Sequence, residues 1–245
     1  MKDQRPATGP ADFADVFTLS DGLEPLVVVG GHAVNLWALH FLKEGVSELE
    51  ELQPFTSKDL DVIGTTKHLE ALHLKLKGKI WRSEPRSPVI GRLELPFGEG
   101  VRIVEVLHTV KGLHFGEIEK NVDLEWEGLT ARVVLPHLML KAKIANSVEI
   151  DQSERNDVRH VRAMIHCTRA FVLGLLAMIE DGTVTQREAV NLLEEIREVI
   201  GSDLARRAVA LWGFDFSRVW PAELMVTKLE KLTRFVEHRL QRPAN

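Results

Sequence analysis

The hydrophobic pattern of this 245-residue chain changes once, near Leu135, and that change limits the folds it can adopt. Before Leu135, short apolar runs rich in β-branched residues are separated by turn-forming residues, a pattern typical of strands. After Leu135, apolar residues recur about every three and a half positions, a pattern typical of helices. The sequence therefore predicts an α+β part followed by an all-helical part.

The first part should open with a strand, a tight turn and a helix. The apolar run from Pro25 ends at Gly30-Gly31, and helical spacing follows to Leu42. We expect a loop over 43–58, a strand over 60–63 and a helix over 64–76. Further strands are expected at 79–81, 91–95, 101–108 and 129–135, and the pair around the turn at 96–100 should form a hairpin.

The second part should consist of successive helices. These are expected at 138–148, 156–179 and 185–200, with a short helix after Ser202 and a last one over about 221–240. Thr185 and Glu188 form a capping box that marks one helix start. We divide the chain into a tail and lead-in (1–24), a sheet-containing domain (25–135) and a helical domain (136–245).

Composition excludes several classes of protein. The longest apolar run, from Ala170 to Ile179, is too short to span a bilayer, so we expect no membrane partner. The N-terminus lacks the apolar core of a secretory signal, which favours a cytoplasmic protein. The single cysteine, Cys167, excludes an internal disulfide framework and a cysteine-rich zinc site. A net charge of −5 argues against a general nucleic-acid coat.

Asp59 and Asp61 begin the second predicted strand. Side chains alternate along a strand, so both carboxylates point to one side while Leu60 points into the core. Magnesium prefers oxygen ligands and commonly takes one or two carboxylates together with substrate phosphates. The pair therefore predicts a Mg²⁺ site, which Mn²⁺ could also fill. An acid-x-acid pair also arises by chance on solvated strands, so it needs supporting residues.

Gly30 and Gly31 lie between a strand and the start of a helix. A backbone without side chains can approach phosphates closely at the positive end of a helix. The alternative is a tight turn without a ligand. His32 follows the glycines and is either a phosphate contact or a packing residue. Ser57 and Lys58 border the first carboxylate, where they are either phosphate contacts or part of a solvated strand end. His160 and His166, six residues apart, lie on different helix faces, so no metal pair is predicted.

The order of these motifs resembles the polymerase-β nucleotidyltransferase superfamily, whose signature is a Gly-Gly or Gly-Ser turn, an acid-x-acid strand and a third acid on a later strand. The stretch from Val29 to Trp37, taken with that from Thr56 to Val62, is similar to the toxin-type, AbiEii-like branch. One departure is the 28-residue separation of Gly31 and Asp59, which requires an extra loop. The resemblance implies a nucleotidyltransferase-like mixed sheet with flanking helices, followed by an all-helical C-terminal domain.

The resemblance also implies further site residues. The third acid, a metal ligand and catalytic base, matches Glu105 best, because a carboxylate inside an apolar run is costly unless it is paired or metal-bound. Glu94 is the alternative. A helix lysine and a downstream aspartate of the toxin-type branch match Lys143 and Asp157, with Lys141 as the alternative for the lysine.

The implied reaction is transfer of a nucleoside monophosphate from a nucleoside triphosphate to an acceptor hydroxyl, with release of pyrophosphate. The resemblance implies an RNA end such as that of tRNA, or a protein, as acceptor, and a cognate antitoxin protein as partner. Two alternatives stay open. The acceptor could be a small molecule of the antibiotic type, bound by the acidic residues Glu48, Glu50 and Glu51, or the protein could bind nucleotide or a partner without catalysis.

Overall fold

The computed structural model describes residues 6–18 and 23–241. Its helices and strands, in chain order, are η1 (Pro10–Phe13), α1 (Ala14–Phe17), β1 (Val27–Val29), α2 (Gly30–Lys43), η2 (Ser47–Leu52), β2 (Asp59–Ile63), α3 (Thr66–Leu76), β3 (Lys79–Arg82), β4 (Val89–Phe97), β5 (Gly100–Leu107), α4 (Phe115–Ile118), β6 (Asn121–Trp126), β7 (Leu129–Val134), α5 (Pro136–Glu149), α6 (Asp157–Glu180), α7 (Gln186–Ile200), α8 (Asp203–Trp212), η3 (Phe216–Val219), α9 (Ala222–Met225), α10 (Glu230–Phe235) and η4 (Val236–Leu240).

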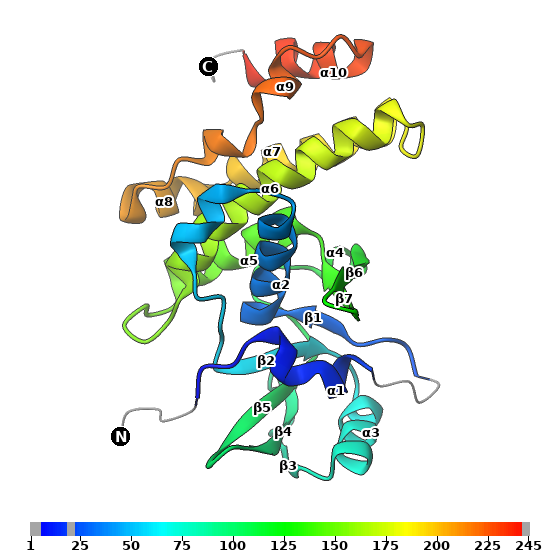
Figure 1. Ribbon diagram of the computed structural model, residues 1–245. Coiled ribbons are helices and arrows are strands. Elements are labelled where there is room, and N and C mark those ends of the chain that lie inside the picture. Colours follow the sequence, from blue (N-terminus) through cyan, green and yellow to red (C-terminus); the bar gives the residue numbers. More distant parts are fainter. Residues whose placement is uncertain (1–5, 19–22, 242–245) are drawn as a thin grey trace.

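The strands form one seven-stranded sheet in the order β3-β4-β5-β2-β1-β7-β6. The sheet is mixed, because β1 runs parallel to β7 and β2 runs parallel to β5, while the remaining neighbours are antiparallel. All helices after β7 belong to the C-terminal part (Figure 1). The predicted α+β class, with a mixed sheet, flanking helices and a helical C-terminal part, is confirmed, and so is the β4–β5 hairpin.

Strand β2 has one apolar and one acidic face. Leu60 and Val62 are fully buried, whereas Asp59 and Asp61 are half-buried on the opposite side. Across the parallel pairing with β5, Asp61 lies in register with Glu105. Directly paired residues of neighbouring strands point to the same side of a sheet, so the three carboxylates share one face.

Helix α2 joins the sheet to the helical part. It begins directly after β1 and packs against both β2 and α6, and Figure 1 shows it rising from the sheet toward the helices above. Trp37 Nε1 donates a hydrogen bond of 2.9 Å to the carbonyl oxygen of Val134 at the end of β7. One continuous core of buried apolar residues runs through the sheet and the helices. The start of α6 is thereby held close to the start of α2.

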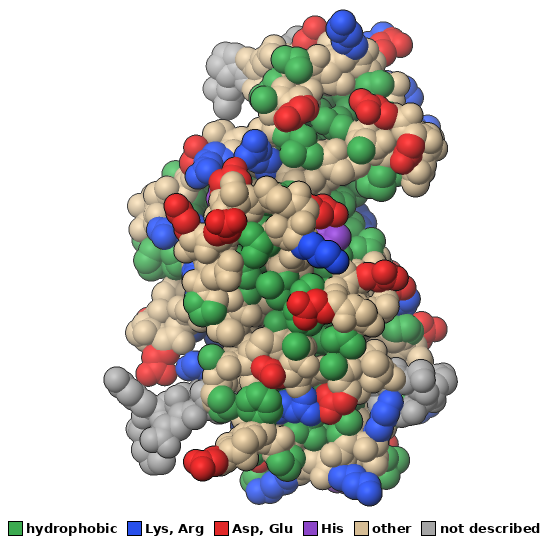
Figure 2. Space-filling view, viewed as in Figure 1, with side chains coloured by type: hydrophobic (Ala, Val, Ile, Leu, Met, Phe, Trp, Pro, Cys, Tyr) green, Lys and Arg blue, Asp and Glu red, His purple; other side chains and the backbone are tan. Residues whose placement is uncertain are grey.

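Helix α6 has 24 residues, and an 18-residue window within it has a mean hydropathy of 1.5, so length and composition alone would allow it to cross a membrane. In this fold it packs against α2, α5 and η3, and it begins with the buried, ion-paired Asp157. Those contacts are typical of the core helix of a folded domain. On the face of the molecule seen in Figure 2, acidic and basic side chains are interspersed among apolar ones.

The N-terminal tail was expected to be loose over residues 1–10. Residues 1–5 lie outside the described residues, and for residues 6–10 the expectation was wrong. Thr8 pairs with Ser57 through two backbone hydrogen bonds of 2.8 and 2.9 Å, and η1 and α1 follow. Phe13 and Val16 are buried in the core. Their spacing of three residues places both on one side of this short helical segment, and this burial holds the segment against the sheet.

Two further expectations differ from the structure. The last helix, expected as one element, is interrupted between α9 and α10, where Thr227 Oγ1 accepts a hydrogen bond from the Leu229 backbone and competes with helical bonding. Strand β6 was not predicted. It contains the charged residues Asp123 and Glu125, and Leu124 is its only buried side chain, so it has no clear apolar run. β6 is an edge strand, so little of it is buried.

Candidate functional site

A cavity of about 290 Å³ lies where β2, the start of α2, α5 and the start of α6 meet. It brings together residues that are far apart in the sequence. Its lining residues are Gly31, Ser57, Lys58, Asp59, Asp61, Lys143, Glu154, Arg155, Asn156, Asp157 and His160. We refer to this space as the carboxylate cavity. Seven of the residues that the sequence singled out as site candidates are among its lining residues, and Gly30 lies beside it against Asp61.

The glycine turn touches the side chains of β2 directly. Gly30 has a φ of +67°, and a β-carbon on it would overlap Asp61 Oδ2 and lie 2.7 Å from Cγ. A β-carbon on Gly31 would overlap the Ser57 hydroxyl. Gly30 therefore lets the backbone take a left-handed conformation, and both glycines leave room for the polar side chains of β2 and the segment before it. The free N–H groups of the first turn of α2 begin here.

The carboxylates of this face repel one another. Removal from water, together with the nearby charges of Asp59 and Glu105, raises the pKa of Asp61 to about 8, against the opposing effect of Lys143 and Arg155. A carboxyl group with so high a pKa holds a proton at neutral pH unless a cation neutralises the cluster. The arrangement favours binding of a cation at Asp59 and Asp61.

The residues described by the structure include no group of three or more His, Cys, Asp or Glu side chains arranged to hold a metal ion. The ligands expected from the sequence, Asp59 and Asp61 with Glu105 on the neighbouring strand, thus do not form a complete three-ligand site by themselves. Two carboxylates match the protein share of a magnesium site that substrate phosphates complete. The like-charge cluster of Asp59, Asp61 and Glu105 fits such an ion.

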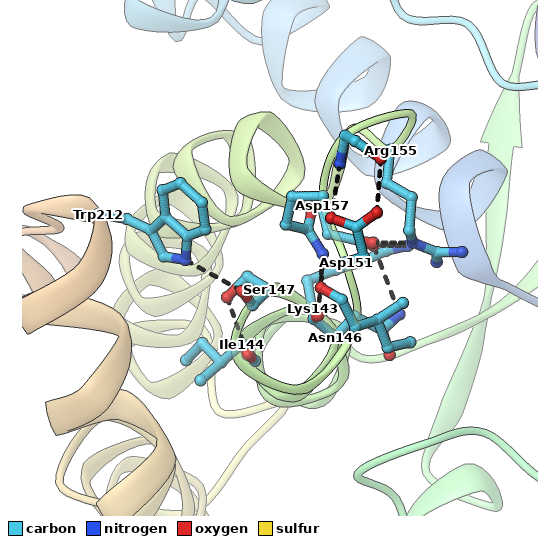
Figure 3. Close-up of polar contacts among 11 residues, drawn as sticks. Lys143, Ile144, Asn146, Ser147, Asp151, Arg155, Asp157 and Trp212 are labelled. Atoms are coloured by element: carbon cyan, nitrogen blue, oxygen red, sulfur yellow. Dashed lines mark hydrogen bonds and ion pairs between the residues drawn. The ribbon is translucent and has the colours of Figure 1, made fainter.

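Lys143 and Asp157 form a buried ion pair on the wall of the cavity. Lys143 Nζ lies 3.0 Å from Asp157 Oδ1, and their side chains are 5% and 2% exposed. Figure 3 shows Lys143 from α5 and Arg155 from the loop before α6 converging on Asp157, with Arg155 Nε 2.6 Å from Oδ2. Burial alone would raise the pKa of Asp157, but Lys143 and Arg155 hold it well below its usual range. Asp157 thus fixes both cations at the cavity.

Besides Gly30, four candidates are not among the lining residues. Glu105 lies on β5, in register with Asp61. His32 is buried, with Nε2 3.4 Å from Thr8 Oγ1 and its ring edge against Phe13, so it packs the N-terminal segment. Glu94 is one strand farther from β2 than Glu105, and it pairs with Arg92 at 3.0 Å. Lys141 pairs with Glu117 at 2.7 Å and lines a different cavity.

The sequence reasoning missed several cavity residues. Arg155, Asn156 and Glu154 come from the loop before α6, and His160 comes from its first turn. His160 had been considered only as a metal partner of His166. Its position three residues after Asp157 places both side chains on one side of α6, and that spacing could have identified it.

Comparison with protein-family models finds no match, and comparison with curated proteins finds none either. One solved structure that matches is described as an antigenic nucleotidyltransferase-like protein from Paracoccidioides brasiliensis. It is 13% identical over 78% of this chain and 95% of that chain, with a TM-score of 0.40. This similarity is too low to assign a fold family or an activity to this chain.

Proposed function

We propose that this protein is a magnesium-dependent nucleotidyltransferase that moves a nucleoside monophosphate from a nucleoside triphosphate to an acceptor hydroxyl. The observation that carries the proposal is the carboxylate cavity itself. It combines two aligned carboxylates, a glycine turn at a helix N-terminus and a buried lysine, although these residues lie on three separate segments of the chain. Carboxylates hold the cation, while the turn and the lysine bind phosphate.

The triphosphate has several donors available in this cavity. The first turn of α2, which begins at Gly30, carries backbone N–H groups without helical partners, and Gly31 lines the cavity. The Ser57 hydroxyl lies beside Gly31. Lys143 uses one of its three N–H groups on Asp157, which leaves two for phosphate oxygens. We assign the β- and γ-phosphates to this group of donors.

Asp59 and Asp61 would hold magnesium, with Glu105 as a further ligand or as the base. The ion would neutralise phosphate charge and help align the α-phosphorus with the acceptor. Glu105 lies on the same face of the sheet as Asp61, and as the base it would accept the proton of the acceptor hydroxyl. The acceptor oxygen forms a bond to the α-phosphorus as the bond to the bridging oxygen breaks, and pyrophosphate leaves. Lys143 and Arg155 offset the charge of the departing group.

For the acceptor we propose an RNA end, such as that of tRNA, or a protein hydroxyl. A toxin role with a cognate antitoxin, and a cytoplasmic location, are parts of the same proposal. The alternative of a small cationic acceptor rested on Glu48, Glu50 and Glu51. Those residues line a separate cavity of about 630 Å³ together with Arg162, His166 and Arg218, and not the carboxylate cavity.

The test is incubation of the purified protein with Mg²⁺, each labelled nucleoside triphosphate, and either total RNA or a protein extract. Asp59→Ala and Asp61→Ala variants serve as inactive controls, and Glu94→Ala tests a carboxylate that we place outside the site. The proposal is supported if the parent and the Glu94→Ala variant transfer label to RNA or protein and the two Asp variants do not. Nucleotide binding that survives Asp59→Ala, without transfer by the parent, would favour a silent binding protein.

A further inference from the structure

The His160 side chain has no hydrogen-bond partner for either ring nitrogen among the residues that the structure describes. The residue is only 6% exposed, and its ring lines the carboxylate cavity. Burying a polar group without a partner costs free energy that a bound ligand can recover. An unpartnered imidazole on the wall of a polar cavity therefore indicates a ligand that reaches this wall.

The neighbours of His160 identify the part of the cavity that such a ligand would occupy. Its Cε1 would lie 3.5 Å from a β-carbon on Gly31, next to the Ser57 hydroxyl. Asp61, by contrast, lies against Gly30. The two glycines thus have different neighbours: the Asp61 carboxylate at Gly30, and the Ser57 hydroxyl and the His160 ring at Gly31. A triphosphate with its α-phosphate near the carboxylates would place its terminal phosphate at the Gly31 end.

We propose that His160 donates its ring N–H to the terminal phosphate of a bound nucleoside triphosphate, so that the site selects triphosphates over diphosphates. This inference rests on the proposed function and adds a specificity residue to it. Burial, followed by the charge of Lys143, holds the pKa of His160 well below its usual range, so the ring is neutral and carries one N–H donor. The neutral donor complements the ammonium of Lys143 without adding a second charge to repel it.

Calorimetry without any acceptor measures this contact separately from catalysis. The parent is titrated with each of the four ribonucleoside triphosphates in the presence of Mg²⁺, and then with the diphosphate of the one that binds most tightly. For His160→Ala we expect triphosphate affinity to fall by about tenfold or more, because a hydrogen bond to a charged group is lost. Diphosphate affinity should change by less than about threefold, because the lost bond belongs to the terminal phosphate.

Two variants guard against a purely structural explanation. His160→Gln keeps an N–H donor near the position of Nε2 and should restore part of the triphosphate preference. His166→Ala removes a histidine of the same helix that is 8% exposed and lines the separate, larger cavity. It should bind triphosphate as the parent does. In transfer assays His160→Ala should raise KM more than it lowers kcat.

Histidine ring NMR of the parent supplies a readout that needs no folded variant. The ring-nitrogen resonance of His160 should shift with triphosphate and much less with diphosphate. The role of His160 would be overturned if its resonance did not change, or if His160→Ala lost triphosphate and diphosphate affinity equally. A trapped water would then be the partner of the His160 ring. If the parent binds no triphosphate at all, the proposed function fails as well.

Discussion

Gly30 and Asp61 fit against each other so closely that a single β-carbon on Gly30 would occupy the position of the Asp61 carboxylate oxygen. The contact joins the phosphate-binding turn to the acidic strand, two motifs that lie 31 residues apart in the sequence. It also explains why the turn carries glycine, since Gly30 has a φ of +67° as well. The position of Asp61 therefore depends on the absence of a side chain at Gly30.

Gly30→Ala tests this contact. The left-handed backbone alone should cost roughly 1–2 kcal/mol of stability, and displacement of Asp61 should add to that cost and reduce transfer by at least about a hundredfold. Gly98→Ala is the matched control, because Gly98 has a φ of +57° but no atom within 4 Å of a β-carbon. Chemical unfolding and the transfer assay compare the two. Equal losses of stability and activity would show that the contact with Asp61 has no special role.

The stability of the metal-free protein should fall as pH rises through the range in which Asp61 titrates. The pKa of Asp61 is raised from 3.8 to about 8, so between these values the folded protein holds a proton that the unfolded chain has lost. Asp61→Asn cannot ionise, so relative to the parent it should gain at least about 1 kcal/mol between about pH 5 and pH 9. Urea unfolding in a chelator measures this, with Glu99→Gln as a control for an exposed carboxylate. The opposite trend would show that Asp61 is ionised at neutral pH without a cation.

Lys143 and Asp157 should behave as a coupled pair. Removing one partner leaves the other charge buried, so Lys143→Met and Asp157→Asn should each cost about 3 kcal/mol. The double variant should cost clearly less than the two single losses added together. Removal of the exposed Arg234–Glu230 pair should have little effect. Additive losses in the double variant would mean that the 3.0 Å contact contributes no coupling energy.

Phe13→Ala tests whether the N-terminal segment is part of the folded unit. Phe13 is fully buried against His32 and beneath the guanidinium of Arg102, so truncation should cost about 3–4 kcal/mol. Phe115→Ala removes a ring of the same size that is 70% exposed, and it should leave stability nearly unchanged. Thermal unfolding separates these outcomes. If the Phe13→Ala protein is as stable as the parent, the N-terminal segment does not contribute to the stability of the fold.

Local patterns predicted much of the fold. The acid-x-acid strand, the β4–β5 hairpin and the capping box at Thr185 each depend on neighbours within a few residues, and each was found. The N-terminal segment was missed because its burial depends on contacts with distant residues, Thr8 with Ser57 and Phe13 with His32. The break before α10 depends on a hydroxyl that competes with helical bonding, which apolar spacing does not reveal.

The candidate site was predictable to the extent that its motifs are short. Asp59, Asp61 and the glycines are close enough in sequence order to be identified together. The resemblance preferred Lys143 to Lys141, but its contact with Asp157 could not be derived from the sequence, because both lysines lie on α5 and packing decides which one faces Asp157. The placement of His32 away from the cavity also depends on packing, since the first turn of α2 presents residues on every side.

The most direct test of the proposed chemistry uses one nucleoside triphosphate labelled in turn at the α- and the γ-phosphate. Nucleotidyl transfer with release of pyrophosphate predicts that acceptor RNA or protein gains label from the α-labelled nucleotide only. It also predicts that Asp59→Ala and Asp61→Ala abolish this label. Label gained from the γ-phosphate would contradict the account, because it would identify the protein as a phosphotransferase.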